Sequence, residues 1–226
     1  AGAAWGTAVA QACGGVLAFR VLLRNPVLHV RLSDSFRPDL AIIKRIANIG
    51  VPAGIEQGIM RVGQLVYTMV VSSLGTVAYA AHQVALNAES FSFMPGAGFA
   101  TASTTLVGQN LGANRPEDAE ESGNISRNLA VLVMSIMALV FFITPQPIVA
   151  IFSKDPEVMA LATVCLRLVA IAQPPLAVWM VLAGGLRGAG DTRAIMKIVA
   201  VGFLFVRVGL AYLLAIHLGY GLIGAW

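Results

Sequence analysis

Long apolar stretches alternate with short polar segments along this chain. Runs without a charged residue cover 1–19, 62–88, 90–114, 128–153, 168–186 and 208–226. A helix needs about 20 largely apolar residues to cross about 30 Å of bilayer hydrocarbon. The pattern therefore predicts an all-α fold, a polytopic bundle of transmembrane helices. We expect these helices at 2–23, 49–74, 77–111, 129–153, 158–187 and 195–218, with a further one starting in the last seven residues.

The polar segment after the first predicted helix is typical of a helix in the membrane interface. Ser33 or Ser35 could cap such a helix, with Pro38 near its first turn. The apolar residues that follow share one face, away from the charged ones: Leu40, Ile43, Ile46 and Ala47. A solvated linker helix is the alternative interpretation.

Two of the long predicted helices contain proline near their centres. Pro95, followed by Gly96, lies within 77–111, and Pro174 lies within 158–187. Proline removes a backbone hydrogen bond and clashes with the preceding turn. We therefore predict that Pro95, Gly96 and Pro174 mark structural kinks or breaks in these helices.

Basic residues gather in alternate loops. One side receives eleven of them, and the other receives only Lys154; the eleven are Arg20, Arg24, Arg31, Arg37, Lys44, Arg45, Arg115, Arg127, Arg187, Arg193 and Lys197. Loops rich in Lys and Arg remain in the cytoplasm. The eleven are therefore predicted to be cytoplasmic.

The composition agrees with a membrane protein and argues against several other classes. Of the 226 residues, 58% are hydrophobic and 12% are charged, whereas about a quarter are charged in ordinary soluble domains. The net charge of +4 lies at helix ends, facing lipid head groups, so we expect no nucleic-acid partner. Cys13 and Cys165 fall in apolar segments and predict neither a disulfide nor a metal site.

Catalytic signatures are missing from the sequence. It contains no His pair of metal-ligand spacing, no Gly-x-Ser-x-Gly elbow and no phosphate-binding loop of Walker spacing. We therefore expect neither an enzyme nor a cofactor, and a transported ligand would be driven by an ion gradient.

Glu56 and Glu89 are the acids inside the predicted spans, and such groups cost about 2.5–3.5 kcal/mol each at mid-helix. At about 100° per residue, the large polar groups of 49–74 share one arc with Glu56, which predicts a helix lining a polar cavity. The candidate residues for binding a substrate or coupling ion are Glu56, Gln57, Gln64, Tyr67, Asn87 and Glu89.

Both acids have a second interpretation. Glu56 could instead form a structural ion pair or lie near the interface, and Arg61 is a possible partner, although about 140° away on the same helix. Glu89 could coordinate an ion or substrate beside the predicted break, or hydrogen-bond the broken backbone.

Three blocks of sequence resemble a known family. AAHQVALNAESFSFMPGAGFATASTTLVGQNLGAN at 80–114, GVPAGIEQ at 50–57 and LRGAGDTR at 186–193 are similar to segments of MATE (multidrug and toxic compound extrusion) exporters, in the same order. The resemblance implies one incomplete six-helix lobe of a twelve-helix transporter. It places the last helix of the N-terminal lobe at 1–23, a cytoplasmic linker at 24–47 and the C-terminal lobe at 48–226. The apolar chain ends also suggest part of a longer protein.

The resemblance further implies an antiporter that exchanges H⁺ or Na⁺ for a small organic cation or amphipathic drug. We expect a monomer in the cytoplasmic (inner) membrane of a bacterium. One Na⁺-linked branch has acids approximately where this chain has Met60, and in the helix that here carries Arg167. Its cation site is therefore not expected here. A lipid-linked oligosaccharide flippase of the same superfamily and a non-transporting membrane scaffold are the alternatives.

Overall fold

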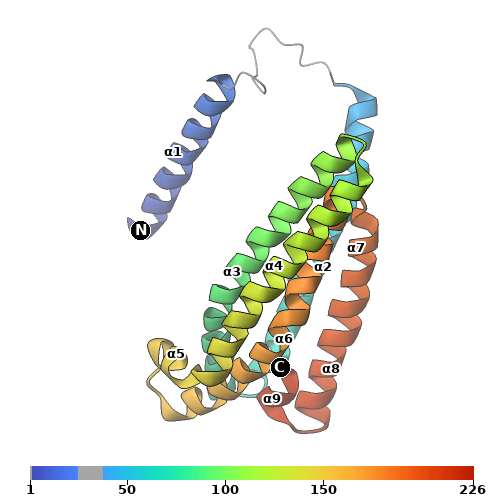
Figure 1. The fold of residues 1–226 in the computed structure, drawn as a ribbon. Coiled ribbons are helices and arrows are strands. Elements are labelled where there is room, and N and C mark those ends of the chain that lie inside the picture. Colours follow the sequence, from blue (N-terminus) through green and yellow to red (C-terminus); the bar gives the residue numbers. More distant parts are fainter. Residues whose placement is uncertain (1, 25–37) are drawn as a thin grey trace. The chain divides into compact units, whose positions relative to one another are not determined.

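The computed structural model describes residues 2–24 and 38–226. Helices make up all the regular secondary structure of the described residues (Figure 1). Residues 1–44 and 45–226 form two separate compact units, and each is described by itself. The all-helical prediction is confirmed for these parts of the chain.

The first unit contains α1, Gly2–Arg24, which confirms the helix predicted at 2–23. Ser33 and Ser35, the predicted caps of an interfacial helix, lie outside the described residues. The predicted separate helix over 40–47 is wrong, because α2 runs without interruption over Leu40–Ser72. The Asp39 carboxylate caps it by accepting the N–H groups of Ala41 and Ile42, at 2.8 and 3.3 Å.

The remaining long helices lie in the second unit. α3 spans Thr76–Gly112 and α6 spans Pro156–Gly188, close to the predicted bounds. Both stay helical through the internal prolines, so the predicted breaks at Pro95, Gly96 and Pro174 are wrong. A proline costs one backbone hydrogen bond, and packing against neighbouring helices can hold the turns on either side together.

The single helix predicted over 129–153 is also wrong. α4 starts at Pro116, well before the apolar run, and ends at Ile143; a separate short helix, α5, spans Pro145–Phe152. Thr144 lies between them at φ −119° and ψ 47°, outside the helical region. A residue before proline is pushed out of the helical region, and Pro145 takes the first helical position, where its missing N–H is tolerated.

The last predicted span, 195–218, is helical but not regular. It consists of α7 (Thr192–Val199), a π-helical segment η1 (Ala200–Val208), α8 (Gly209–Tyr212) and a second π-helical segment η2 (Leu213–His217). The chain then turns at Gly219 into α9, Gly221–Ala225. π-helical turns are rare and often occur at functional sites, and the sequence did not predict them.

Close packing of α3 against α6 forms the centre of this unit. A Cβ at Gly184 would overlap the carbonyl oxygen of Ala100, and one at Gly188 would overlap that of Thr104. Small residues four apart let helix backbones approach closely. In the described residues Thr104 also donates a hydrogen bond across this contact to the Gly184 carbonyl, at 2.8 Å.

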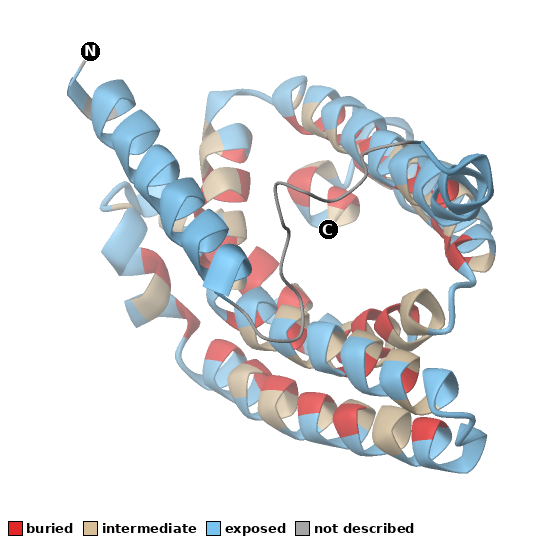
Figure 2. Cartoon of the chain, turned by 90° about the horizontal axis from the view of Figure 1, so that it is seen from above, coloured by how far each residue is buried: buried red, intermediate tan, exposed pale blue. Residues whose placement is uncertain are grey.

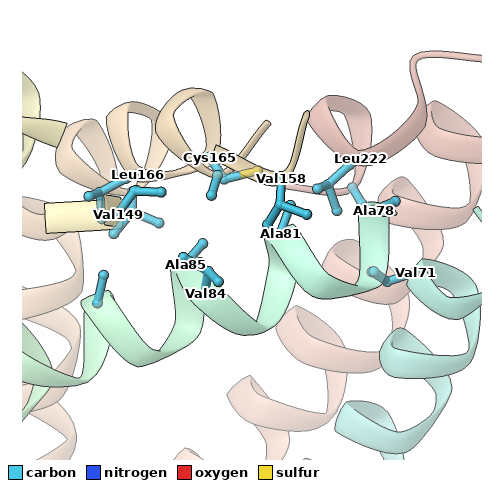
Figure 3. Packing of buried hydrophobic residues seen from close by; sticks show 14 of the residues in the cluster. Val71, Ala78, Ala81, Val84, Ala85, Val149, Val158, Cys165, Leu166 and Leu222 are labelled. Carbon is cyan, nitrogen blue, oxygen red and sulfur yellow. The ribbon is translucent and has the colours of Figure 1, made fainter. Parts of the chain in front are cut away.

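Buried apolar residues turn toward neighbouring helices, and the outer faces are exposed (Figure 2). The largest cluster joins α2, α3, α4, α5, α6, α8, η2 and α9, and its members include Val71, Ala81, Val84, Val149, Leu166 and Leu222 (Figure 3). Much of the outer surface consists of large apolar side chains such as Leu132, Ile136, Leu139 and Phe205. Such a surface suits contact with lipid.

The helices of the second unit connect alternately at two ends (Figure 1). The turns at 113–115 and 189–191 lie at the end where α2 enters the unit, and the turns at 73–75 and 153–155 lie at the other. The predicted arrangement on one side, away from the turn with Lys154, is therefore confirmed for the basic residues at these two turns. The predicted loop after the first helix, with Arg31 and Arg37, lies outside the described residues.

Four helical segments of the described residues are long and apolar enough to cross a membrane. They are Ala4–Arg24, Pro116–Ile143, Pro156–Gly188 and Thr192–His217. The more polar α2 and α3 are not among them, although both were predicted as spans. The chain is a multi-pass membrane protein.

Candidate transport site

Glu56 on α2 pairs with Arg187 near the end of α6. The Glu56 side chain is 1% exposed, and its Oε1 accepts a hydrogen bond from Nη2 of Arg187 at 2.5 Å. A buried carboxylate needs such a partner because an unpaired charge away from water is costly. The pair connects residues 131 positions apart in sequence.

Arg61 is not the partner of Glu56 that the sequence suggested. Its side chain is exposed, whereas Arg187 comes from another helix. A second contact supports the same junction: the Thr192 hydroxyl, at the start of α7, donates to the Ile49 carbonyl at 3.0 Å. The ion-pair interpretation of Glu56 thus fits the geometry, and these contacts hold α2 to the α6–α7 turn.

Further along α2, Tyr67 is the centre of a buried aromatic group. Its hydroxyl donates to the Ala225 carbonyl at 2.9 Å. The His82 ring of α3 lies between the rings of Tyr67 and Trp226, with centroid separations of 5.5 and 5.2 Å. This group fixes α2 and α3 to the start of α9.

Arg207 of η1 faces this aromatic group. Its guanidinium carbon lies 5.1 Å from the centroid of the Tyr67 ring and 5.2 Å from that of Phe203. The Arg207 side chain is itself exposed. Arg207 therefore places a positive charge beside the rings of Tyr67 on α2 and Phe203 on η1.

A pocket of about 210 Å³ opens beside Arg207. Its lining comes from α2, α6, α7 and η1, and comprises Met60, Trp179, Ile198, Val199, Gly202, Phe203 and Arg207. A second pocket, of about 250 Å³, lies between α4 and α6 and is lined by Ser135 and apolar residues. Arg207 gives the first pocket a charge that the second does not have.

The residues of the predicted polar arc of α2 differ in how far they are buried. Glu56 and Tyr67, at one edge of the arc, are buried; Gln64 is half-buried; Gln57 is exposed. The arc covers about 140° by the 100° rule, so only part of it can face the other helices. The inward position of Glu56 and Tyr67 agrees with the prediction, whereas Gln57 is exposed and is not part of the contacts described for this site.

The two candidates on α3 differ from each other. Glu89 is half-buried. Asn87 is exposed, and its backbone carbonyl accepts a hydrogen bond from Ser90 at 2.6 Å. The contacts of the described residues do not join Glu89 to Glu56, so the two acids occupy separate environments.

The proline-containing stretch of α3 is packed rather than broken. Ser92 donates to Oε1 of the buried Gln173 at 2.9 Å, one residue before Pro174. A Cβ on Gly96 would meet the sulfur atoms of Met134 and Met180 at 2.8 and 3.0 Å. These positions join α3 to α4 and α6.

The contacts of Arg187 and Arg207 were not predicted from the sequence. Arg207 was visible as a charge inside an apolar run, and such residues mark functional sites. Arg187 was counted only among the loop residues. Its pairing with Glu56 depends on how α2 and α6 meet, which local patterns do not show.

The sequence matches a family model over most of its length. The model described as MatE covers residues 52–213. The chain belongs to the MatE family. All the residues discussed above from Glu56 to Arg207 fall within this match, which confirms the resemblance found in the three sequence blocks.

Curated relatives carry multidrug-resistance names. The chain is 28% identical over 225 residues to a probable multidrug resistance protein NorM of Thermotoga maritima, covering all of this chain and 48% of the relative. It is 33% identical over 195 residues to the multidrug resistance protein NorM of Burkholderia vietnamiensis, covering 84% of this chain and 42% of that protein. The chain spans about half the length of the curated relatives it matches.

Solved structures agree with the fold. A crystal structure of a MATE P26A mutant matches with a TM-score of 0.91 at 20% identity, over all of this chain and 50% of that one. An outward-facing multidrug resistance MATE transporter of the MOP superfamily matches with a TM-score of 0.68 at 23% identity, over 80% of this chain and 40% of that one. The chain therefore has the MATE transporter fold.

Proposed function

We propose that this chain forms the C-terminal half of an ion-coupled exporter in the inner membrane of a bacterium. The transporter exchanges H⁺ or Na⁺ for small amphipathic or cationic compounds, works as a monomer, and is not an enzyme. In this proposal residues 1–23 form the last helix of the first lobe, 24–47 the linker and 48–226 the second lobe.

The family match over 52–213, with relatives named multidrug resistance proteins, is the observation that carries this proposal. The acids inside the bundle support it. Ionisable groups inside membrane proteins are expensive and mark ion or substrate pathways. Glu89 is half-buried without an ion pair among the described residues, whereas Glu56 is paired with Arg187.

Glu89 is therefore the coupling residue that we propose. A proton and an organic cation can each neutralise the same carboxylate, so the two ligands compete for it. Such competition produces antiport, because binding of one ligand releases the other. The pairing of Glu56 with Arg187 gives Glu56 a supporting role, in which it keeps α2 against α6.

The test is dye efflux from cells that express the full-length transporter, normalised to the amount of protein in the membrane. Glu89→Gln keeps the size of the side chain and removes its charge, and we expect it to abolish most efflux. Glu56→Gln is expected to reduce efflux less. Wild-type export by both variants would refute coupling through these acids.

A lipid-linked oligosaccharide flippase is the second candidate, and Arg207 is the observation that favours it. A flippase needs cationic groups to bind the lipid diphosphate. Arg207 is the charged residue that lines the pocket between α2, α6, α7 and η1. Unchanged dye efflux on deletion of the gene, together with impaired surface glycan assembly, would favour the flippase.

A further inference from the structure

Arg167 places a charge on the outer face of α6, in a largely apolar stretch. The residue is exposed, and within 2–24 and 38–226 its side chain has neither an ion pair nor a hydrogen bond. Val169, two residues further along, is 4% exposed and belongs to the largest buried cluster. At about 100° per residue, Arg167 lies about 160° from Val169 on the helix circumference. Arg167 therefore points away from the bundle, on the face of α6 that also carries the exposed Ile171 and Leu182.

The position of Arg167 along α6 places it in the outer half of the membrane. The 33 residues of α6 extend about 50 Å at about 1.5 Å per residue, whereas the bilayer hydrocarbon is about 30 Å thick. For a helix centred on the bilayer, Arg167 lies five residues, about 7–8 Å, from the middle, on the side of the α5–α6 turn. The bias of basic residues assigns that side to the exterior. An arginine at this depth can extend its guanidinium toward the head groups of the outer leaflet.

The pocket of about 250 Å³ between α4 and α6 begins one helical turn from Arg167. We call it the α4–α6 groove, and its lining comprises Ser135, Ala138, Leu139, Phe142, Ala170 and Ile171. The two alanines are buried and form its floor, whereas Leu139, Phe142 and Ile171 are exposed and form its edges. On the α6 circumference Arg167 lies between Ala170 and Ile171, about 60° and 40° from them. The charge is therefore in line with the groove.

The α4–α6 groove has a length and direction that suit one lipid chain. Phe142 is the penultimate residue of α4, and Ser135 lies seven residues, or about 10 Å, further into the membrane. One leaflet takes up half of the hydrocarbon thickness, or about 15 Å. Since α6 enters the membrane from the same side, Arg167 lies at the outer end of the groove. The groove therefore runs from the outer end of α4 toward the middle of the bilayer, as an acyl chain of the outer leaflet does.

We propose that Arg167 and the α4–α6 groove bind one anionic phospholipid of the outer leaflet. The guanidinium presents paired N–H donors that match the oxygens of a phosphate, and one acyl chain lies in the apolar groove. Charge complementarity favours this occupant, since a charged side chain that faces hydrocarbon is costly without an anionic group nearby. An anionic headgroup is preferred to a zwitterionic one, because choline would place a second cation beside Arg167. The inference goes beyond the proposed function and does not depend on the exported compound.

Quenching of a tryptophan in the groove by brominated lipids measures lipid binding at this place. The reporter is Phe142→Trp in the full-length transporter, reconstituted into nanodiscs of phosphatidylcholine. The readout is the quenching that this tryptophan adds to the signal of the wild-type protein. The probes are phosphatidylglycerol and phosphatidylcholine with brominated acyl chains. We expect phosphatidylglycerol to bind about ten-fold more tightly, which is the difference that one charge-assisted hydrogen bond makes.

Variants of the reporter protein separate the charge from the groove. Arg167→Gln is expected to abolish the preference for phosphatidylglycerol, and Arg167→Lys to keep part of it. Arg61→Gln, at an exposed arginine of α2 outside the groove lining, is the matched control and should keep all of it. Ser135→Phe fills the inner end of the groove without a change of charge, and should reduce quenching by both lipids. The midpoint of thermal unfolding checks that each variant is folded.

The proposal is supported if the preference for phosphatidylglycerol is lost in Arg167→Gln and kept in Arg61→Gln. Equal affinity of the reporter protein for the two lipids would overturn it, as would a preference that survives in folded Arg167→Gln. Displacement of brominated phosphatidylglycerol by inorganic phosphate would identify a site for free anions instead. A tryptophan that neither lipid quenches would show that another part of the transporter covers the groove. Unchanged quenching in Ser135→Phe would contradict an acyl chain in the groove.

Discussion

At the scale of single residues, charge placement separates structural roles from transport roles. Glu56 is 1% exposed and its partner Arg187 is 36% exposed, so the two members of the pair depend on each other unequally. Removing Arg187 leaves a buried carboxylate without compensation, whereas removing Glu56 leaves a guanidinium that water can reach. We therefore expect Arg187→Gln to lower the free energy of unfolding by about 2–4 kcal/mol, more than Glu56→Gln.

The measurement is the midpoint of thermal unfolding in detergent for both single variants and for Glu56→Gln/Arg187→Gln. The double variant should be more stable than Arg187→Gln alone, because it no longer buries an unpaired charge. Arg61→Gln, at an exposed position on the same helix, is the control with little expected effect. Equal losses in the two single variants would contradict this assignment.

The candidate residues show which features of the site could be predicted from the sequence. The periodicity of α2 predicted that Glu56 and Tyr67 turn inward, because burial of one helix face is a local property of the pattern. The partners of these residues, Arg187 and Ala225, come from helices far away in sequence. Local spacing could not identify them, since they depend on how the helices pack together.

At the scale of helices, the glycines of α6 set the distance between α3 and α6. Gly184→Ala and Gly188→Ala would each push a Cβ against a backbone carbonyl oxygen that cannot move alone, whereas Gly98→Ala on α3 would point into open space. Overpacking of this kind costs about 1–3 kcal/mol. Thermal unfolding should show a loss of that size for the α6 variants, and no loss or a slight gain for Gly98→Ala. Wild-type stability of both α6 variants would contradict the close packing.

The presence of the long helices followed from apolar length, but the starts of α2 and α4 and the effects of the prolines did not. Pro145 ends α4 because it comes with Pro147 and a non-helical Thr144, at the edge of the bundle. Pro95 and Pro174 stay within continuous helices, where the flanking turns pack against neighbours. The same residue type therefore breaks a helix or is tolerated according to tertiary packing, which the sequence pattern alone does not contain.

At the scale of the whole molecule, the helix connections alternate between two ends of the second unit, and basic residues gather at one of these ends. Together these two observations indicate a single membrane topology. Within residues 45–226 the turns at 113–115 and 189–191 share one end, and the turn between α5 and α6, which contains Lys154, lies at the other (Figure 1). The bias of Lys and Arg assigns the first end to the cytoplasm. Ala189 and Lys154 are both exposed positions in turns, so a cysteine at either place can be labelled without disturbing a helix.

Sidedness can therefore be measured by cysteine labelling in intact cells that express the full-length transporter. Cys13 and Cys165 are first replaced by alanine, so that each variant of this half has one new thiol. We expect a membrane-impermeant maleimide to label Lys154→Cys from outside and Ala189→Cys only after the membrane is opened. Cys165 is fully buried, so its replacement is checked by wild-type dye efflux. Labelling of Ala189→Cys in intact cells would reverse the orientation, because the α6–α7 turn would then face the exterior together with the Glu56–Arg187 pair beside it.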